Sequence, residues 1–326
     1  MKIAVIGSGG WGTAVSVLLA GKGNDVYLWS WIQEETDRLR RDRENKEFLP
    51  GVRLDDRIVC THDMKECIEG AEAVITAAPS PATRTTAKQM ARYIAPGQKI
   101  VNISKGLEGK LRLSEVYRSE IPQADISVLS GPSHAEEVSR GIPTTVVVAS
   151  EDGKTAEFLQ ELFMTPSFRV YTSNDIIGVE LGGALKNVIA LCAGISDGLG
   201  YGDNTKAALI TRGVAEITRL GTAMGAKAST FSGLSGLGDL IVTGTSTLSR
   251  NYRAGRLIGE GLSLEEALEK VHMVVEGVNT AGAAYELSRE YGVETPIIEH
   301  AYKILFGGMD PHEAVDLLMT RRRTNE

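Results

Sequence analysis

The sequence contains 326 residues, of which 42% are hydrophobic, and its formal net charge is −7 at pH 7. A chain of this length and composition is expected to form two domains of ordinary size, with a core that needs no disulfides or structural metal. The acidic excess argues against a protein whose main role is to bind nucleic acid, because such proteins usually present a basic face.

The first half of the chain alternates short apolar runs with amphipathic segments. The predicted strands are Lys2–Ile6, Asp25–Trp29, Ala73–Ala77, Lys99–Ile103, Ile126–Leu129, Thr145–Ala149 and Phe168–Tyr171. Several are nearly continuous in Val, Ile and Ala, which is typical of strands buried on both faces of a parallel sheet. Helical segments separate them, such as Gly12–Lys22, Gln33–Arg43 and Pro81–Ile94. This alternation predicts a doubly wound, Rossmann-type α/β domain with a mostly parallel sheet over residues 1–174.

From Asp175 onward the sequence shows helical periodicity and no convincing strand. One helix face is indicated by apolar residues at helical spacing, namely Leu181, Leu185, Val188, Ile189 and Cys192. Another helix begins after Ser263, a plausible N-cap, and two more are predicted over Pro296–Phe306 and Pro311–Thr320. The second domain, residues 175–326, is therefore predicted to be all-helical.

The first predicted strand is followed by Gly7-Ser8-Gly9-Gly10-Trp11-Gly12 and then by a helix, which places a G-x-G-x-x-G pattern between strand and helix. In this context Gly7 permits a tight turn, Gly9 lets a pyrophosphate approach the backbone, and Gly12 lets helix and strand pack closely. Free N–H groups at the helix start bind the diphosphate. The pattern alone also fits a glycine-rich hairpin, but its position in a β-α-β unit indicates a site for NAD or NADP.

The end of the second predicted strand leaves the choice between the two dinucleotides open. An acidic residue there typically binds the ribose 2′-hydroxyl of NAD, and a nearby arginine accommodates the 2′-phosphate of NADP. Here the segment is Leu28–Ile32, which is neither acidic nor basic. Ser30 can hydrogen-bond either form. Arginines of the next helix are within reach of a 2′-phosphate, although a solvated charged face explains them better: Arg38, Arg40 and Arg41.

Polar residues follow three other predicted strands, where ligands of open α/β sheets bind. Ala78–Pro81 follows one strand and is expected to flank the nicotinamide side. Lys105 follows the next and is placed at the ligand crevice, unless it is simply solvated. In the third segment Gly131, Pro132 and Ser133 form a turn that can bind substrate oxygens, although Ser133 can equally be an N-cap.

The helical half contributes further polar groups. Lys186 and Asn187 lie in an otherwise apolar or small stretch, one turn after Gly182 and Gly183. Burial lowers the pKa of a lysine toward the range that suits proton transfer, whereas a lysine that snorkels at a helix edge is the alternative.

Two later segments carry the remaining charged candidates. Asp239 lies between glycines and an apolar run that reaches Thr243. Ser249-Arg250-Asn251 combines a hydroxyl, a guanidinium that matches a phosphate, and a plausible helix cap.

The cysteines and histidines indicate no disulfide and no metal. Cys60, Cys67 and Cys192 show no paired spacing, which is typical of reduced thiols in a cytosolic protein. The five histidines show no ligand spacing. We expect no secretory signal, and no apolar stretch approaches membrane-spanning length. The prediction is a cytoplasmic protein without stable membrane insertion.

These motifs together resemble the bacterial form of the NAD(P)-dependent glycerol-3-phosphate dehydrogenase family. The resemblance extends from the first strand to about Pro296. The matching elements, in chain order, are Gly7–Gly12 with Trp29, Phe48–Gly51, Lys105–Glu108, Ser130–Pro132, Gly182–Asn187, Ala208–Gly213, Gly236–Leu240, Ser249–Asn251 and Val275–Gly277.

The resemblance implies a role for each matching position. Lys186 is implied to be the general acid/base, with Lys105 and Asp239 orienting it and polarising the carbonyl. The implied substrate contacts are Lys105, Gly131, Ser133, Lys186, Asn187, Asp239, Thr243, Ser249, Arg250 and Asn251. The implied cofactor contacts are Gly7, Gly9, Gly10, Trp11, Gly12, Trp31, Lys105, Ala135, Arg250, Val274 and Glu276. The family often has a basic residue or histidine where this chain has Trp31, which puts selectivity for NADP in doubt.

The implied activity is the reversible reduction of dihydroxyacetone phosphate to sn-glycerol 3-phosphate by NADH or NADPH, for phospholipid synthesis. A homodimer with a small phosphate ester as substrate and no nucleic-acid partner is expected. One alternative is a related hydroxyacid or ketoacid reductase, 6-phosphogluconate- or ketopantoate-like. Another is a dinucleotide-binding protein without catalysis, which would need neither Lys105 nor Lys186.

Overall fold

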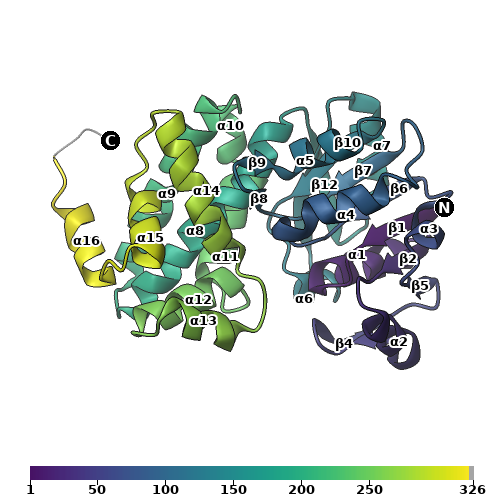
Figure 1. Cartoon of the computed structure of the whole chain (residues 1–326), viewed down its shortest axis with the longest axis horizontal. Coiled ribbons are helices and arrows are strands. Elements are labelled where there is room, and N and C mark those ends of the chain that lie inside the picture. Colours follow the sequence, from purple (N-terminus) through teal and green to yellow (C-terminus); the bar gives the residue numbers. More distant parts are fainter. Residues whose placement is uncertain (323–326) are drawn as a thin grey trace. The chain divides into compact units, whose positions relative to one another are not determined.

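The computed structural model describes residues 1–322, and the chain separates into two compact units between Glu180 and Leu181 (Figure 1). The boundary predicted from the sequence, between Asn174 and Asp175, lies shortly before this point. Residues 323–326 of the predicted second domain lie outside the described residues.

Unit 1 is built on an eight-stranded sheet with the order β12-β11-β10-β7-β6-β1-β2-β5. The strands are β1 (Lys2–Ile6), β2 (Asp25–Trp29), β5 (Ile58–Thr61), β6 (Ala73–Thr76), β7 (Lys99–Asn102), β10 (Asp125–Ser130), β11 (Thr144–Ala149) and β12 (Phe168–Ser173). Neighbours are parallel except for the antiparallel pair β10–β11. The prediction of a doubly wound, mostly parallel sheet is confirmed.

The sheet carries a hydrophobic core on each face. In β1, Ile3 and Val5 belong to one apolar cluster, whereas Ala4 and Ile6 belong to the other, because successive side chains of a strand point to opposite faces. All four are fully buried. This explains why β1 is continuously apolar and does not alternate.

The helices of unit 1 connect these strands. They are α1 (Gly10–Gly21), α2 (Gln33–Asp42), α3 (Met64–Ile68), η1 (Ser80–Ala82), α4 (Thr83–Met90), α5 (Leu113–Glu120), α6 (Ala135–Val138) and α7 (Gly153–Phe163). The predicted helix Pro81–Ile94 is partly wrong: it begins as the 3₁₀ turn η1 and ends at Met90. Pro96 disfavours helical backbone at Ala95, so the segment before it turns instead.

Five short strands were not predicted: β5 and two hairpins, β3 (Glu44–Asn45) with β4 (Leu49–Arg53), and β8 (Leu107–Glu108) with β9 (Leu111–Arg112). Strands β3, β8 and β9 have two residues each, too few to establish a period of two. Strand β4 contains Pro50 and Gly51, residue types that are depleted in strands.

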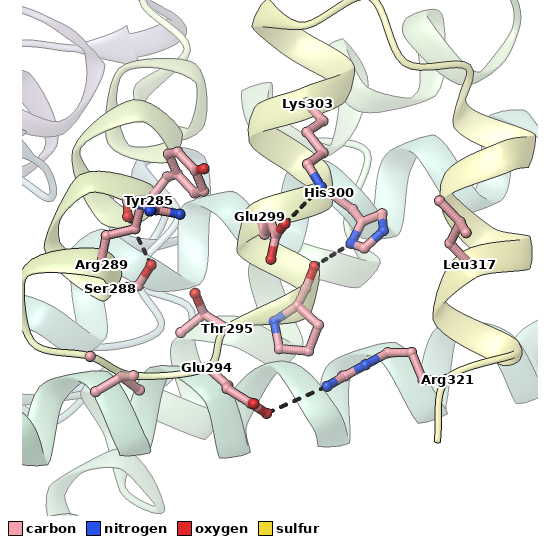
Figure 2. A pocket seen from close by; sticks show the side chains of 13 residues that line it. Tyr285, Ser288, Arg289, Glu294, Thr295, Glu299, His300, Lys303, Leu317 and Arg321 are labelled. Atoms are coloured by element: carbon pink, nitrogen blue, oxygen red, sulfur yellow. Dashed lines mark hydrogen bonds and ion pairs between the residues drawn. The ribbon is translucent and has the colours of Figure 1, made fainter. Parts of the chain in front are cut away.

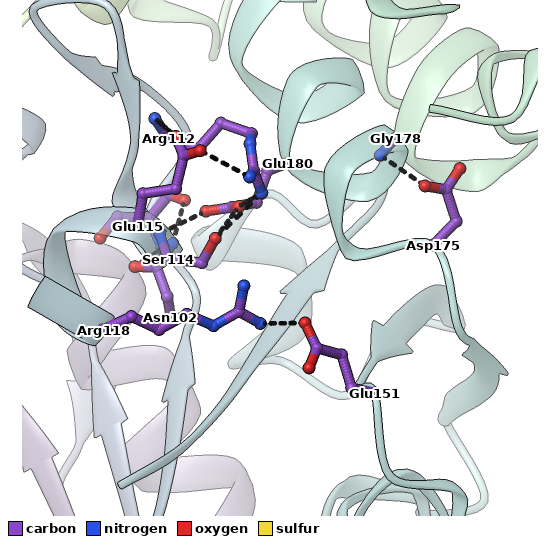
Figure 3. Close-up of polar contacts among 10 residues, drawn as sticks. Asn102, Arg112, Ser114, Glu115, Arg118, Glu151, Asp175, Gly178 and Glu180 are labelled. Atoms are coloured by element: carbon purple, nitrogen blue, oxygen red, sulfur yellow. Dashed lines mark hydrogen bonds and ion pairs between the residues drawn. The ribbon is translucent and has the colours of Figure 1, made fainter. Parts of the chain in front are cut away.

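The last residue of unit 1, Glu180, is anchored at the start of α5 (Figure 3). Its carboxylate accepts hydrogen bonds from the Ser114 backbone N–H at 2.8 Å and from the Ser114 hydroxyl, and it pairs with Arg112 at 3.1 Å. Burial raises the pKa of Glu180, and the hydrogen bonds from Ser114 and the charge of Arg112 oppose that rise. These bonds hold the start of α8 (Ile176–Gly198), which up to Glu180 belongs to unit 1, beside α5.

Within the described residues, unit 2 contains helices and no strand, so the prediction of an all-helical second half is confirmed. After α8 come α9 (Asp203–Ala223), α10 (Ala228–Phe231), the π-helical turn η2 (Leu234–Gly238), α11 (Asp239–Thr245), α12 (Arg250–Gly259), α13 (Leu264–Val271), α14 (Glu276–Glu290), α15 (Pro296–Phe306) and α16 (Pro311–Met319). Ser263 caps α13 with a complete capping box, as the sequence predicted.

One expectation about apolar length was wrong. Helix α8 is long and apolar enough to cross a membrane by length and composition. However, 89% of its most apolar window is buried inside the protein, as in the core helix of a soluble protein.

Glycines let α8 and α12 pack backbone against backbone. A Cβ on Gly194 of α8 would lie 2.1 Å from the Tyr252 carbonyl oxygen, and one on Gly255 of α12 would lie 2.0 Å from the Leu191 oxygen. Gly198 and Gly259, one turn further on each helix, are equally close to the facing backbone. This glycine seam fixes the spacing between the helix that carries Lys186 and the helix that begins at Arg250.

A buried carboxylate joins α9 to the start of α15. Glu216 accepts hydrogen bonds from the backbone N–H of Ile297 at 2.8 Å and of Ile298 at 3.2 Å. Burial raises the pKa of Glu216 from its ordinary value of 4.5 to about 7, and these N–H groups only partly oppose the rise. The folded chain therefore holds a proton on Glu216 that the unfolded chain has released between these two values.

We predict a pH dependence of stability from this carboxyl group. Because its pKa is higher in the folded state, its contribution to the free energy of unfolding falls as pH rises from about 4.5 to about 7, by up to about 3 kcal/mol. Glu216→Gln mimics the protonated side chain at every pH. Denaturant unfolding of both proteins at about pH 5 and about pH 8 should show wild type losing stability relative to the variant. A constant difference would contradict the assignment.

Candidate active site

The predicted cofactor residues of unit 1 gather along one edge of the sheet. Strands β2, β1, β6, β7 and β10 run parallel, so their carboxyl ends share that edge. The glycine turn Gly7–Gly12 follows β1, Lys105 follows β7, and Gly131 follows β10. This is the edge at which open α/β sheets bind ligands.

The glycine turn has the shape that a dinucleotide requires. Gly7 has φ +113°, and a Cβ on Gly12 would lie 1.9 Å from the Gly7 carbonyl oxygen, so both positions need glycine. A Cβ on Gly9 would meet nothing within 4 Å, which leaves open space beside the turn. Gly9 is the N-cap of α1, and no side chain caps it. The residues therefore fit a bound diphosphate, which would meet the N–H groups of this helix end.

Asn45 supports the turn and was not predicted. Its amide donates to the Ser8 carbonyl oxygen at 2.7 Å and to the Thr13 hydroxyl at 2.8 Å. It comes from the short strand β3 and is buried. The sequence offered no signal for it, because Asn45 is more than 30 residues away along the chain from the two residues that it contacts.

Lys105, Gly131 and Ser133 lie together. The Lys105 ammonium donates to the Gly131 carbonyl oxygen at 2.8 Å and to the Ser133 hydroxyl at 3.2 Å. Ser133 is not an N-cap, since α6 begins after His134. This arrangement places a cation beside a hydroxyl and a tight turn at the ligand edge.

The other predicted cofactor positions of unit 1 are Gly10, Trp11, Trp31 and Ala135, and their surroundings differ. Trp11 donates its indole N–H to the Ile103 carbonyl oxygen at 3.2 Å. A Cβ on Gly10 would lie 3.8 Å from the Ala135 Cβ, so these two positions are neighbours. Trp31 is 54% exposed, so its ring is available to a ligand.

In unit 2 the predicted acid/base lysine is held in a buried polar network. The Lys186 ammonium donates to Asp239 Oδ1 at 2.9 Å and to Thr243 Oγ1 at 2.5 Å. The side chains of Lys186 and Asp239 are 5% and 2% exposed. Lys186 is therefore not a snorkelling lysine. The carboxylate of Asp239 compensates the charge of the buried ammonium. In a buried site of low dielectric constant, the ammonium stabilises a nearby negative charge more strongly than it would in water.

The turn before Asp239 is unusual. Residues Leu234–Gly238 form a π-helical turn, a geometry that occurs frequently at functional sites. A Cβ on Gly182 of α8 would lie 2.7 Å from the Ser235 carbonyl oxygen, so this glycine lets the turn approach α8. The close approach brings Asp239 to Lys186.

Asn187 and Asn251 connect three helices. The Asn251 amide donates to Asn187 Oδ1 at 2.9 Å, and Asn251 Oδ1 accepts from the Gly277 N–H at 2.8 Å. Both asparagines are buried. The network orders the first turn of α12 beside α8 and the first turn of α14.

The remaining predicted positions of unit 2 lie at these helix starts. Ser249 is the N-cap of α12, where it accepts from the Tyr252 N–H, and Arg250 is the first helical residue. Glu276 begins α14, and Val274 just before it is exposed. A helix N-terminus with an arginine at its first position suits a phosphate group.

A pocket of about 590 Å³ lies elsewhere in unit 2, beside the start of α15 (Figure 2). Four of its charged side chains form ion pairs, Lys303 with Glu299 at 2.7 Å and Arg321 with Glu294 at 3.6 Å. The residues that line it include none of the predicted site residues.

The cysteines are free thiols, and Cys60 and Cys67 are buried. Burial raises the pKa of Cys67 and of Cys192 to about 12, so neither is a reactive thiolate. In residues 1–322, no group of three or more His, Cys, Asp or Glu side chains is placed to hold a metal ion.

The comparisons with known proteins cover both parts of the chain. The model for the N-terminal domain of NAD-dependent glycerol-3-phosphate dehydrogenase matches residues 2–156, and the model for its C-terminal domain matches residues 175–316. The chain belongs to this dehydrogenase family. The resemblance seen in the sequence is thereby confirmed.

Curated relatives match over the whole chain. The glycerol-3-phosphate dehydrogenase (NAD(P)+) of Moorella thermoacetica is 56% identical over 100% of this chain and 97% of its own length. The enzyme of the same name from Bacillus subtilis is 51% identical, over 100% and 96%. The crystal structure of glycerol-3-phosphate dehydrogenase from Coxiella burnetii is similar with a TM-score of 0.95, at 38% identity over 98% of this chain and 99% of that one.

A more distant likeness bears on the alternative reductase hypothesis. A ketopantoate reductase structure from Ralstonia eutropha matches with a TM-score of 0.62 at 16% identity. At this level of identity the likeness concerns the fold alone.

Proposed function

We propose that this chain catalyses the reversible reduction of dihydroxyacetone phosphate to sn-glycerol 3-phosphate with NADH or NADPH. Family membership supports the reaction. The single observation that carries the mechanism is the buried Lys186 ammonium held by Asp239 and Thr243. A bound nicotinamide dinucleotide supplies or accepts the hydride.

The chain supplies charge and a proton to the carbonyl oxygen. In the direction of reduction, Lys186 donates its proton to the oxygen as negative charge develops there, and in the reverse direction it removes that proton. Asp239 and Thr243 hold the ammonium in place. Lys105, steadied by Gly131 and Ser133, polarises the carbonyl.

We assign the phosphate to the start of α12. Arg250 provides a guanidinium there, and the hydroxyl of Ser249 and the amide of Asn251 are already ordered by backbone contacts. Asn187 supports Asn251.

The domain assignment and the cellular role belong to the same proposal. Residues 1–174 bind the dinucleotide, and residues 175–326 carry the acid/base lysine. We further propose a cytoplasmic homodimer that supplies the glycerol phosphate backbone of phospholipids and has no nucleic-acid partner and no stable membrane insertion.

A substrate panel tests the reaction. Purified protein with NADH or NADPH is given dihydroxyacetone phosphate, ketopantoate or, in the oxidative direction, 6-phosphogluconate, and nicotinamide absorbance is followed. Turnover should be confined to dihydroxyacetone phosphate and its reduced product. Faster turnover of ketopantoate or 6-phosphogluconate would favour the alternative reductase, and no turnover of any substrate would favour a non-catalytic binding protein.

A further inference from the structure

A buried carboxylate from the next helix lies beside the end of β2, although the strand-end segment Leu28–Ile32 contains no acidic residue. Glu35, in the first turn of α2, is 9% exposed. Its Oε1 accepts from the Ser8 hydroxyl at 2.8 Å and its Oε2 accepts from the Ser30 hydroxyl at 2.5 Å. Ser8 belongs to the glycine turn, and Ser30 follows the last residue of β2. Through these two hydrogen bonds, Glu35 links the glycine turn to the end of β2.

The position of Glu35 is specified by its surroundings. A glutamate at the third position of a helix commonly turns back to the N-cap backbone, but Ile32 caps α2 and no such bond forms. The Ser30 hydroxyl also accepts from the Ile32 N–H at 3.3 Å. The neighbouring Glu34 is exposed. Glu35 is thus held inward while the adjacent glutamate faces solvent.

The arginines that could offset this negative charge are engaged elsewhere. Arg38 pairs with Glu47 at 3.2 Å, Arg40 donates to the Cys60 carbonyl oxygen at 2.8 Å, and Arg41 pairs with Asp42 at 2.7 Å. These are the three arginines that the sequence offered as partners for a 2′-phosphate. These contacts direct the three guanidinium groups to partners other than Glu35.

We propose that Glu35 makes this chain select NADH over NADPH. This inference rests on the proposed function only in assuming that a nicotinamide dinucleotide binds at the glycine turn. An acidic residue at the end of the second strand favours a ribose 2′-hydroxyl, and a negative charge there repels a 2′-phosphate. In this chain the charge belongs to Glu35 of the following helix, which Ser8 and Ser30 hold beside the strand end, and not to a residue of the strand itself.

Binding titrations test the proposal without turnover. The dissociation constants of NADH and NADPH are measured by nucleotide fluorescence for wild type, Glu35→Gln and the matched control Glu34→Gln. Wild type should bind NADH more tightly. Glu35→Gln should shrink the NADPH-to-NADH ratio of dissociation constants about tenfold, mainly by tightening NADPH, since one charge at this range acts on that order. Glu34→Gln should leave the ratio unchanged.

Further variants keep the test decisive. Glu35→Asp retains the charge and should retain the preference. Asn45→Ala removes the other support of the turn and should weaken both nucleotides alike. AMP and adenosine 2′,5′-bisphosphate, used as competitors, should show the same change in ratio as the full dinucleotides. A wild-type preference for NADPH, or an unaltered ratio in a folded Glu35→Gln protein, overturns the inference. If the ratio of dissociation constants behaves as expected but dihydroxyacetone phosphate is not reduced, the proposed reaction is overturned and the role of Glu35 in selecting NADH is not.

Discussion

Replacing Lys186 with alanine is expected to lower kcat for the reduction of dihydroxyacetone phosphate by roughly a hundred- to ten-thousand-fold, the range typical of a lost general acid. The ammonium is the proton donor, and its loss also removes positive charge from the developing alkoxide. The dissociation constant of NADH should change little, because no atom of Lys186 belongs to the glycine turn. Steady-state kinetics and a fluorescence titration on the same preparation measure both quantities.

Stability has to be measured alongside this variant. Removing Lys186 takes away the cation that lies 2.9 Å from the buried carboxylate of Asp239, and breaking a buried ion pair from one side typically costs about 3–5 kcal/mol. The double variant Lys186→Ala/Asp239→Asn removes that charge, so it should recover stability but not turnover. Lys303→Ala, at a half-buried lysine of α15 that pairs with Glu299, serves as the matched control and should keep wild-type kcat. Undiminished turnover in Lys186→Ala would exclude it as the acid/base.

Local sequence patterns predicted seven of the eight strands of the main sheet and the glycine turn, for a physical reason. A strand buried on both faces needs a continuous apolar run, and a tight turn onto a helix needs glycine at Gly7 and Gly12. Both requirements act on residues that are adjacent in the chain. The same holds for Ser263, whose capping box spans only one helical turn.

Contacts between residues that lie far apart in the chain could not be predicted from local sequence patterns. The pairing of Lys186 with Asp239 was implied only by the family resemblance, because the two are brought together by the π-helical turn and by Gly182. Asn45 and Glu35 were missed for the same reason. Glu35 lies in a stretch of charged residues whose general character is that of a solvated helix face, and only the two serines that bond to it reveal that it faces inward.

The glycine seam gives the clearest case of a long-range requirement. Gly194 and Gly198 lie one turn apart on α8, as do Gly255 and Gly259 on α12. Each set alone weakens a helix. Together they allow the two backbones to touch, and this contact places the Arg250 end of α12 in a fixed position relative to Lys186.

Replacing Arg250 with alanine is expected to lower kcat/KM for dihydroxyacetone phosphate by roughly a hundred- to ten-thousand-fold, mainly through KM. Each charge-assisted hydrogen bond to a phosphate contributes about 1.5–3 kcal/mol, and a guanidinium can donate two. At saturating NADH, the unphosphorylated substrate dihydroxyacetone should lose little, because it has no phosphate for Arg250 to bind. Arg253→Ala is the matched control, since Arg253 lies one turn further along α12 and is exposed. Equal losses for the phosphorylated and unphosphorylated substrates would show that Arg250 acts on the fold or the cofactor and does not recognise the phosphate.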